Sequence, residues 1–240
     1  MLRLYLDENS IEIGLDEAGR GALAFEVCAS AVILPTYIPD EFDNPKDKKL
    51  LEQIKDSKKM TKIQRENCAE FIKRFALFYA TETASPQEID EMNILKATML
   101  AMHRAIDKVR EQMQAPSSSP IKSINQSNEE ESSKKIRILA DGDRFYPYYD
   151  ESTRKIIPFT CIPDGDSLYM NIAAASILSK VHRDHLVEEY CKNNAGISEK
   201  YGFLSNKAYG TKKHMDGLKQ HGSTIFHRKS FGPIKKILLR

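Results

Sequence analysis

The chain has 240 residues, of which 41% are hydrophobic and 29% are charged, which fits a soluble globular protein. No apolar run reaches the length of a membrane span, and residues 1–8 become acidic too early for a secretory signal. The four cysteines are widely spaced, so we expect reduced thiols in a cytoplasmic protein and no zinc site. A net charge of +2 does not by itself indicate nucleic acid, but Lys and Arg gather in residues 55–74 and 206–240.

Strands and helices are predicted to alternate through the first half of the chain. Apolar and β-branched runs predict strands at residues 11–15, 23–34 and 75–83. Residues 36–49 are rich in Pro, Asp and Lys and are expected to form an exposed loop, and the second half of 50–75 has helical spacing. The sequence Ser-Pro-Gln-Glu at 85–88 is a helix start, and helical spacing continues to about Gln112.

The second half of the chain completes an α/β layer structure. Residues 114–135 are Ser-rich, polar and aperiodic, so we expect a flexible surface insertion and not a domain linker. Strands are predicted at 136–140 and 156–162, a long helix at 168–193, and more helix with a basic tail in residues 201–240. We therefore expect one domain over residues 1–240, with a single sheet and interleaved helices.

Two predicted strands end in acidic residues. Asp16 and Glu17 directly follow the first strand, and Asp141 follows the strand at 136–140. Ligands gather beyond the carboxyl ends of strands in open α/β sheets, so we expect these acids to meet there, joined by Asp166 before the long helix. Taken alone, an Asp-Glu pair is usually an exposed turn, and Asp166 is more simply a helix N-cap. Together, four converging carboxylates require a cation, and oxygen ligands suit Mg²⁺ or Mn²⁺.

A Gly-Arg-Gly turn, formed by Gly19, Arg20 and Gly21, comes directly after the acidic pair and Ala18. Glycine lets the backbone approach another molecule closely and adopt positive φ where this is required. Exposed backbone N–H groups and an arginine, beside carboxylates that collect metal ions, indicate a site that handles phosphate.

Nine short motifs follow one another along the chain: DEAGRG at 16–21, DSKKM at 56–60, NILKAT at 93–98, ADG at 140–142, GDS at 165–167, IAAASILSK at 172–180, YGF at 201–203, NKAYGT at 206–211 and HRKSF at 227–231. Each motif is weak alone, but their order is highly specific. The chain thereby resembles type 2 ribonuclease H (ribonuclease HII) over nearly its full length, apart from the 114–135 insertion.

The resemblance implies a ribonuclease H-like fold, in which helices flank a mixed central sheet and a helical extension forms the C-terminus. It implies endonucleolytic cleavage of RNA paired with DNA, including single ribonucleotides embedded in duplex DNA, by an enzyme with four metal-binding acids. Those acids, the catalytic metal ligands of the family, match Asp16, Glu17, Asp141 and Asp166. We expect a two-metal-ion mechanism and a cut on the 5′ side of the ribonucleotide that leaves 3′-OH and 5′-phosphate ends, performed by a monomer.

The resemblance also implies how the substrate is recognised. The backbone of Gly19, Arg20 and Gly21 matches the motif that reads the ribose 2′-OH, the group that separates RNA from DNA. Tyr209 matches a tyrosine that stacks on the sugar of the adjoining deoxynucleotide, and Ser57 and Lys58 fall in a motif that binds the hybrid. Three positions depart from the family pattern, where Pro, a small residue and Gly are usual: Ala22, Phe25 and Ala208.

Other polar side chains keep two interpretations. Lys58 and Lys59 either hold substrate phosphates or form a solvated basic face. Lys180 and Arg183 either face the nucleic-acid backbone, or Arg183 pairs with a neighbouring acid on the surface. The six histidines lack further ligands at zinc spacing, so surface positions are expected, with a structural or phosphate-adjacent place for the one in the HRKSF motif.

Two other classes of function compete with a ribonucleotide-specific nuclease. One is a nucleic-acid binding protein that has the fold but does not cleave, and the four acids disfavour it because a binder gains nothing from groups that repel phosphate. The other is a nuclease of the same fold that acts on DNA junctions, and the Gly-Arg-Gly turn beside the acids disfavours it.

Overall fold

The computed structural model describes residues 2–39, 42, 44–55, 57–114 and 135–239. The main sheet has the strand order β3-β2-β1-β4-β7. Its strands are β1 (Ser10–Ala18), β2 (Val27–Ile33), β3 (Phe78–Ala84), β4 (Lys135–Asp141) and β7 (Phe159–Ile162), and β5 (Tyr149–Asp150) pairs with β6 (Lys155–Ile156) separately. β1 is antiparallel to β2 and parallel to β4, so the sheet is mixed, as predicted. The predicted insertion lies outside the described residues, apart from Gln114 and Lys135.

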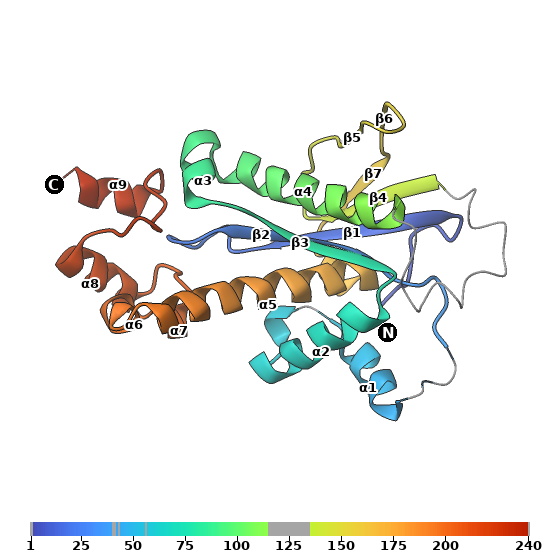
Figure 1. Cartoon of the computed structure of the whole chain (residues 1–240), viewed down its shortest axis with the longest axis horizontal. Coiled ribbons are helices and arrows are strands. Elements are labelled where there is room, and N and C mark those ends of the chain that lie inside the picture. Colours follow the sequence, from blue (N-terminus) through green and yellow to red (C-terminus); the bar gives the residue numbers. More distant parts are fainter. Residues whose placement is uncertain (1, 40–41, 43, 56, 115–134, 240) are drawn as a thin grey trace.

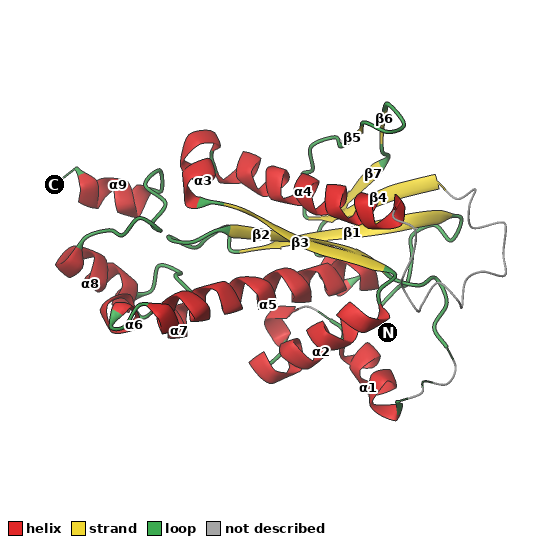
Figure 2. Cartoon of the chain, viewed as in Figure 1, coloured by secondary structure: helices red, strands yellow, loops and turns green. Residues whose placement is uncertain are grey.

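Helices cover both faces of this sheet, and a further group lies beyond one of its ends (Figures 1 and 2). The bounds are α1 (Pro45–Gln53), α2 (Lys62–Phe75), α3 (Pro86–Met92), α4 (Ile94–Gln114), α5 (Met170–Asn193), α6 (Ile197–Tyr201), α7 (Phe203–Asn206), α8 (Lys212–His221) and α9 (Gly232–Leu238), with 3₁₀ turns η1 (Ser57–Lys59) and η4 (Gly165–Ser167). α4 packs on one face, α5 on the other with α1 and α2 outside it, and α6 to α9 form the terminal group.

The alternation of side chains along β1 creates a separate core on each face of the sheet. Ile13 and Leu15 are fully buried with the apolar residues of α4. Gly14, between them, faces α5, where a Cβ would lie 2.4 Å from the backbone carbon of Asn171. α5 therefore lies directly against the central strand, and its small residues, such as Ala173 and Ala174, belong to the second core.

A third core ties the segment after β1 to the C-terminal helices. Leu23 and Phe25 are buried with Tyr201 and Phe203, and the Phe25 ring centroid lies 5.1 Å from that of Phe203. Phe25 has a φ of 67°, so a large side chain occupies a left-handed position here. Phe25, where the family pattern usually has a small residue, thus fills the junction between the sheet and the terminal helices.

Several predicted boundaries need correction. The expected loop at 36–49 contains the start of α1, which Asn44 caps and Pro45 opens. The helix predicted to run from 86 to about 112 is two helices, because Asn93 has a φ of 73° and ends α3. The predicted strand at 23–34 begins only at Val27, and the one at 156–162 is divided into β6 and β7.

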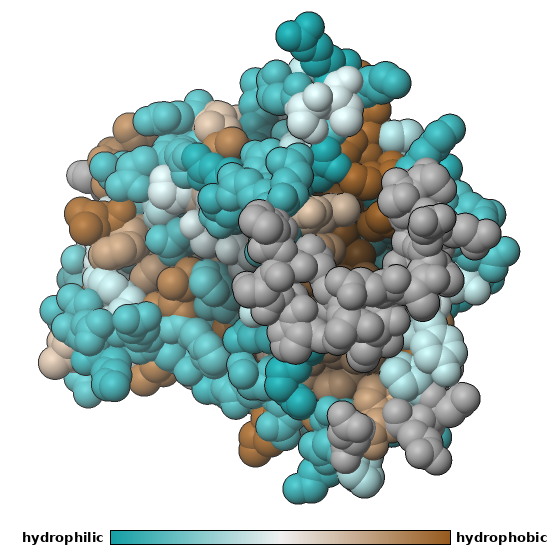
Figure 3. Space-filling model, turned by 45° about the vertical axis from the view of Figure 1, so that its right-hand side comes forward, coloured by the Kyte–Doolittle hydropathy of each residue, from teal (hydrophilic) through white to brown (hydrophobic). Residues whose placement is uncertain are grey.

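The capping box predicted for α3 is confirmed, since Ser85 and Glu88 each bond the other's backbone N–H. All four cysteines are free thiols, as expected. Within the described residues, no helix combines the length and the apolar character needed to cross a membrane. On the face shown in Figure 3, hydrophobic residues reach the surface in several separate areas among hydrophilic ones.

Candidate active site

The carboxyl ends of β1 and β4 bring the first acids together. The strands run in parallel, and their register pairs Leu15 with Ala140, so Asp16 and Asp141 follow on adjacent strands. Both acids lie within their strands rather than after them, since Asp141 is the last residue of β4 and Asp16 is followed in β1 by Glu17 and Ala18. Asp16 is buried, and Glu17 donates its backbone N–H to Asp16 Oδ1 at 2.6 Å.

The fourth acid reaches the same region through the η4 turn. Asp166 is buried, and the preceding Gly165 donates its backbone N–H to Asp141 Oδ1 at 2.7 Å. A Cβ at position 165 would lie 2.7 Å from Ile172 Cδ1 and 3.3 Å from the same carboxyl oxygen, so glycine is required for this approach. The interpretation of Asp166 as the cap of the long helix is wrong, because the N-cap of α5 is Tyr169.

Burial and the charges of neighbouring acids disfavour ionisation of Asp16 and Glu17. Burial raises the pKa of Asp16 well above its ordinary value, and the charges of Glu17 and Asp141 raise it further. Burial also raises the pKa of Glu17, although Arg20, whose Nη1 lies 3.2 Å from Glu17 Oε1, and Lys58 partly offset this. A cation held among the acids would relieve both effects.

The donor chemistry of this region fits a hard divalent cation, because it consists of carboxylate oxygens. Among the residues that the structure describes, no group of three or more His, Cys, Asp or Glu side chains is arranged so that it could hold a metal ion. The fit therefore rests on the kind of donors and on their unfavourable mutual charge, not on a preformed coordination shell.

Ser57 lies behind the acids, inside the protein. Its side chain is buried, and its hydroxyl is 2.9 Å from that of Ser176 on α5. Ser176 in turn hydrogen-bonds to the Asp16 carboxyl. The side chain of Ser57 thus supports Asp16 through Ser176, whereas the neighbouring Lys58 is exposed near Glu17.

The Gly-Arg-Gly turn is shaped by a buried arginine beneath it. Gly19 has a φ of 96°, and a Cβ there would lie 2.1 Å from Arg183 Nε, so only glycine fits. Gly21 does not have a positive φ, and it is exposed beside the Tyr209 ring, which would lie 3.7 Å from an added Cβ. The turn therefore presents Arg20 and Gly21 to solvent next to the acids.

Arg183 is neither a surface ion-pair partner nor a phosphate ligand, which corrects both interpretations of it. Its side chain is 1% exposed, and its guanidinium donates to three backbone carbonyls, those of Ala24, Glu26 and Lys207, at 3.2, 3.3 and 2.9 Å. It thereby ties the segment after β1 to the loop that carries Tyr209.

A second buried arginine supports the same turn. Arg228 is fully buried, and it donates through Nη1 to the backbone oxygen of Arg20 at 3.0 Å and through Nε to that of Phe25 at 2.9 Å. Burial lowers the pKa of Arg228 to about 9, with a further contribution from the Arg183 charge. The sequence indicated a role for this motif but not that its arginine is buried.

Tyr209 lies against the Gly-Arg-Gly turn, as a shared site requires. It forms an isolated antiparallel bridge with Ala22, and its side chain is 38% exposed. The Arg183 guanidinium carbon lies 5.5 Å and the Lys180 Nζ 6.0 Å from the centroid of its ring. The structure therefore places a partly exposed aromatic ring near two cationic groups, next to the turn that follows the acids.

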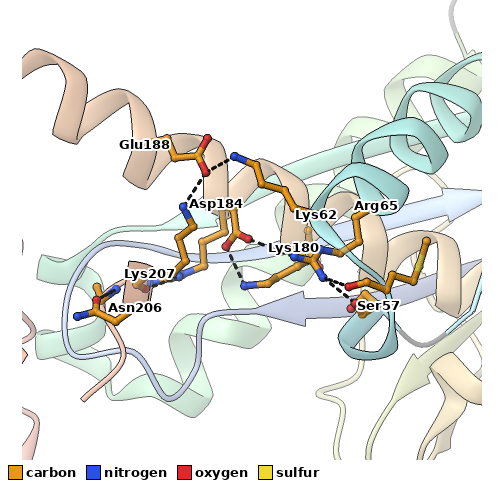
Figure 4. Close-up of polar contacts among 12 residues, drawn as sticks. Ser57, Lys62, Arg65, Lys180, Asp184, Glu188, Asn206 and Lys207 are labelled. Carbon is orange, nitrogen blue, oxygen red and sulfur yellow. Dashed lines mark hydrogen bonds and ion pairs between the residues drawn. The ribbon is translucent and has the colours of Figure 1, made fainter. Parts of the chain in front are cut away.

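Three lysines gather along α5 in this region, Lys180 from the helix itself and Lys62 and Lys207 from other segments (Figure 4). Lys62 and Lys207 both donate to Glu188 Oε1 at 2.6 Å, and Lys180 donates to Asp184 Oδ1 at 2.8 Å. The two acids on α5 thus hold three ammonium groups on one side of the helix, between η1 and the Tyr209 loop.

Solved structures show the class of fold. The crystal structure of ribonuclease H2 from Pyrococcus horikoshii OT3 matches with a TM-score of 0.60 at 21% identity, covering 94% of this chain and 96% of that one. The structure of Bst-RNase HIII in complex with Mn²⁺ matches with a TM-score of 0.59 at 18% identity, covering 96% of this chain and 70% of that one. The chain has the ribonuclease H-like α/β fold.

Sequence comparisons identify the family. A family model described as Ribonuclease HII matches residues 13–233. Ribonuclease HII of Phocaeicola vulgatus is 40% identical over 231 residues, which are 96% of this chain and 94% of the relative. Ribonuclease HII of Cytophaga hutchinsonii is 41% identical over 224 residues, covering 93% and 90%. The chain is a ribonuclease H, a hydrolase, and it belongs to the ribonuclease HII family.

Proposed function

We propose that the protein hydrolyses the RNA strand of RNA–DNA hybrids and cuts on the 5′ side of ribonucleotides embedded in duplex DNA. The products are 3′-OH and 5′-phosphate ends. The observation that carries this proposal is the union of three parts in one place: the acids, the Gly-Arg-Gly turn and the exposed ring of Tyr209. We propose that the single domain acts as a cytoplasmic monomer.

Asp16, Glu17, Asp141 and Asp166 would hold Mg²⁺ or Mn²⁺. A pair of such ions supplies an activated water and stabilises the leaving oxygen of a phosphodiester. The support from this chain is that its acids are oxygen donors, partly buried, whose mutual charge a cation relieves. The Mn²⁺ in the related Bst-RNase HIII structure agrees with this choice of metal.

Recognition would use the groups that flank the acids. Main-chain groups of Gly19 and Gly21 approach the 2′-OH of the ribose, and Arg20 steadies the adjacent phosphate. Tyr209 packs against the next deoxyribose, so the site reads an RNA-to-DNA step. Lys58, close enough to Glu17 to affect its pKa, and Lys180, near the Tyr209 ring, would contribute charge for the phosphate backbone.

The test uses a DNA duplex with one embedded ribonucleotide, a long RNA–DNA hybrid and an all-DNA duplex. We expect cleavage of the first two with Mg²⁺ or Mn²⁺, a cut 5′ of the lone ribonucleotide, and no cleavage of all-DNA duplex.

Asp16→Asn should reduce cleavage to background while the variant still folds and binds hybrid. Asp143→Asn, at an exposed acid, is the matched control and should cleave normally. Comparable cleavage of all-DNA duplex, or an active Asp16→Asn, would overturn the proposal.

A further inference from the structure

A pair of buried histidines lies behind the Tyr209 loop and outside the acid site. His214 on α8 and His227, in the segment before α9, are both fully buried, and their Nε2 atoms are 3.0 Å apart. Both rings pack against Tyr201 and Phe203. This corrects the expectation that histidines other than the one in the HRKSF motif lie at the surface.

The hydrogen bonds around the pair determine which nitrogen carries each proton. The backbone N–H of Thr224 can only donate, and it points to His227 Nδ1 at 2.8 Å, so this nitrogen accepts. The proton of neutral His227 must then be on Nε2, which donates to His214 Nε2. His214 Nε2 accepts, so the proton of His214 is on Nδ1, which donates to the backbone oxygen of Tyr209 at 3.0 Å.

Both rings are neutral in this arrangement, because an added proton would place two donors face to face at one of these contacts. Burial lowers the pKa of His214, and burial together with His214 lowers the pKa of His227 to about 4. The chain of donors thus has one direction, from Thr224 through both rings to the carbonyl of Tyr209.

The loop of residues 207–209, which accepts the last hydrogen bond of this series, has a strained backbone, and each of its carbonyls is hydrogen-bonded. Lys207 and Ala208 have φ angles of 48° and 65°, which disfavour residues other than glycine. Arg183 donates to the oxygen of Lys207, and the N–H of Leu23 donates to that of Ala208 at 2.9 Å. Together with the bond from His214, three successive carbonyls are fixed, as expected where a functional side chain must be held in a strained turn.

We propose that His214 and His227 form a directional hydrogen-bond relay that positions Tyr209 and thereby sets the preference for a lone ribonucleotide in DNA. The relay rests on the proposed role of Tyr209 in packing against the deoxyribose. His214 and His227 do not reach the substrate themselves. They are positioning residues that act through the backbone at Tyr209.

Two substitutions of His214 distinguish the contact that its Nδ1 makes with the Tyr209 oxygen from the contact that its Nε2 makes with His227. The amide of Asn takes the place of Nδ1 and keeps a donor for the Tyr209 oxygen, whereas the amide of Gln takes the place of Nε2 and loses it. We expect His214→Gln to lower kcat/KM at a lone ribonucleotide roughly fivefold, as for one lost hydrogen bond, with less than a twofold effect within long hybrid. His214→Asn should stay within about twofold of the wild type on both substrates. Equal losses for both variants would overturn the relay.

A double-mutant cycle tests whether the effect passes through Tyr209. In a Tyr209→Ala background, His214→Gln should change kcat/KM at a lone ribonucleotide less than about twofold, because the ring that His214 positions is already absent. Multiplicative losses would overturn the proposal. His103→Gln is the matched control, since His103 Nε2 also bonds a backbone oxygen, that of Tyr146, at 3.0 Å, but lies on α4. It should leave both rates unchanged.

The positions of the ring protons of His214 and His227 can be measured in the absence of substrate. In ¹⁵N-labelled wild-type protein at pH 7, imidazole spectra should show the Nε2–H tautomer for His227 and the Nδ1–H tautomer for His214. His214→Gln, but not His103→Gln, should shift the ring resonances of Tyr209. Charged rings or the opposite tautomers would overturn the relay even if cleavage is as proposed. The expected spectra with no cleavage of a lone ribonucleotide would instead overturn the proposed function and, with it, the role of the relay in preference.

Discussion

Asp16 shows how one residue is held in surroundings that oppose its charge. Burial, Glu17 and Asp141 all raise its pKa, so its ionised form destabilises the folded protein at neutral pH when no cation is present. We expect Asp16→Asn to raise the free energy of unfolding by about 1–2 kcal/mol in EDTA at pH 7.5. Denaturant unfolding measures this change.

The same variant should respond less to metal. If Mg²⁺ binds only the folded wild type, the melting temperature of the wild type rises as the Mg²⁺ concentration increases. The melting temperature of Asp16→Asn should rise less. Asp143→Asn, whose carboxyl is 80% exposed, should behave as the wild type in both conditions. A variant that is less stable than the wild type in EDTA would show that Asp16 is a net structural support.

Tyr209 is expected to act through its ring. The ring lies beside Gly21 and near two cationic groups, those of Lys180 and Arg183. We expect Tyr209→Ala to lower kcat/KM at a lone ribonucleotide about tenfold or more, since stacking on an aromatic ring contributes ~1–3 kcal/mol. The loss of kcat/KM on long hybrid should be smaller. Tyr209→Phe should retain both activities. Equal losses on the two substrates would indicate that the ring serves general packing.

At the scale of elements, β1 packs directly against α5. Gly14 leaves no room for a side chain, because a Cβ would lie 2.4–2.6 Å from Asn171 atoms. Gly14→Ala should therefore force the helix away and cost about 2–4 kcal/mol. We expect the melting temperature to fall by roughly 5–15 °C. Gly232→Ala, where nothing lies within 4 Å of an added Cβ, should change it little.

Most elements were predictable because their sequence patterns are local. The apolar run at 11–15 and the capping box at Ser85 specify their own structure, and both the strand and the capped helix form as expected. The errors arise where one residue overrides a pattern. Asn93 adopts a left-handed φ within an otherwise continuous helical spacing, and Pro45 opens a helix inside a segment whose composition is typical of a loop.

The acids could be placed from the sequence because strand ends and register follow from the sheet, and the resemblance identified Tyr209. The burial of Ser57, Arg183, His214 and Arg228 could not. Polar residues are usually exposed, and their partners here are far away in the chain. Arg183, for example, bonds the oxygens of Ala24 and Glu26, more than 150 residues earlier. Such contacts have no periodic pattern to predict them.

At the scale of the whole molecule, the site lies where the sheet meets the C-terminal helices. Three of the acids belong to the sheet and Asp166 to the η4 turn, Tyr209 belongs to the terminal group, and the Gly-Arg-Gly turn connects the two parts. Arg183 and Arg228 join the two parts through backbone carbonyls, so the proposed recognition requires this junction to remain folded. Its stability should respond to the titration of the buried histidines.

His227 sets the direction of that response. Its pKa is lowered by burial and by His214 to about 4, below the value of about 6.5 for an unfolded chain. The unfolded state therefore binds the proton first, and the stability that neutral His227 contributes is lost as the pH falls from about 6.5 to about 4. His227→Gln should be less stable than the wild type at pH 7.5, and the difference should shrink by about 2–3 kcal/mol at pH 4.5. Urea unfolding at both pH values measures it, with His103→Gln measured in parallel. A difference for His227→Gln that is independent of pH would show that the buried pair does not titrate with unfolding.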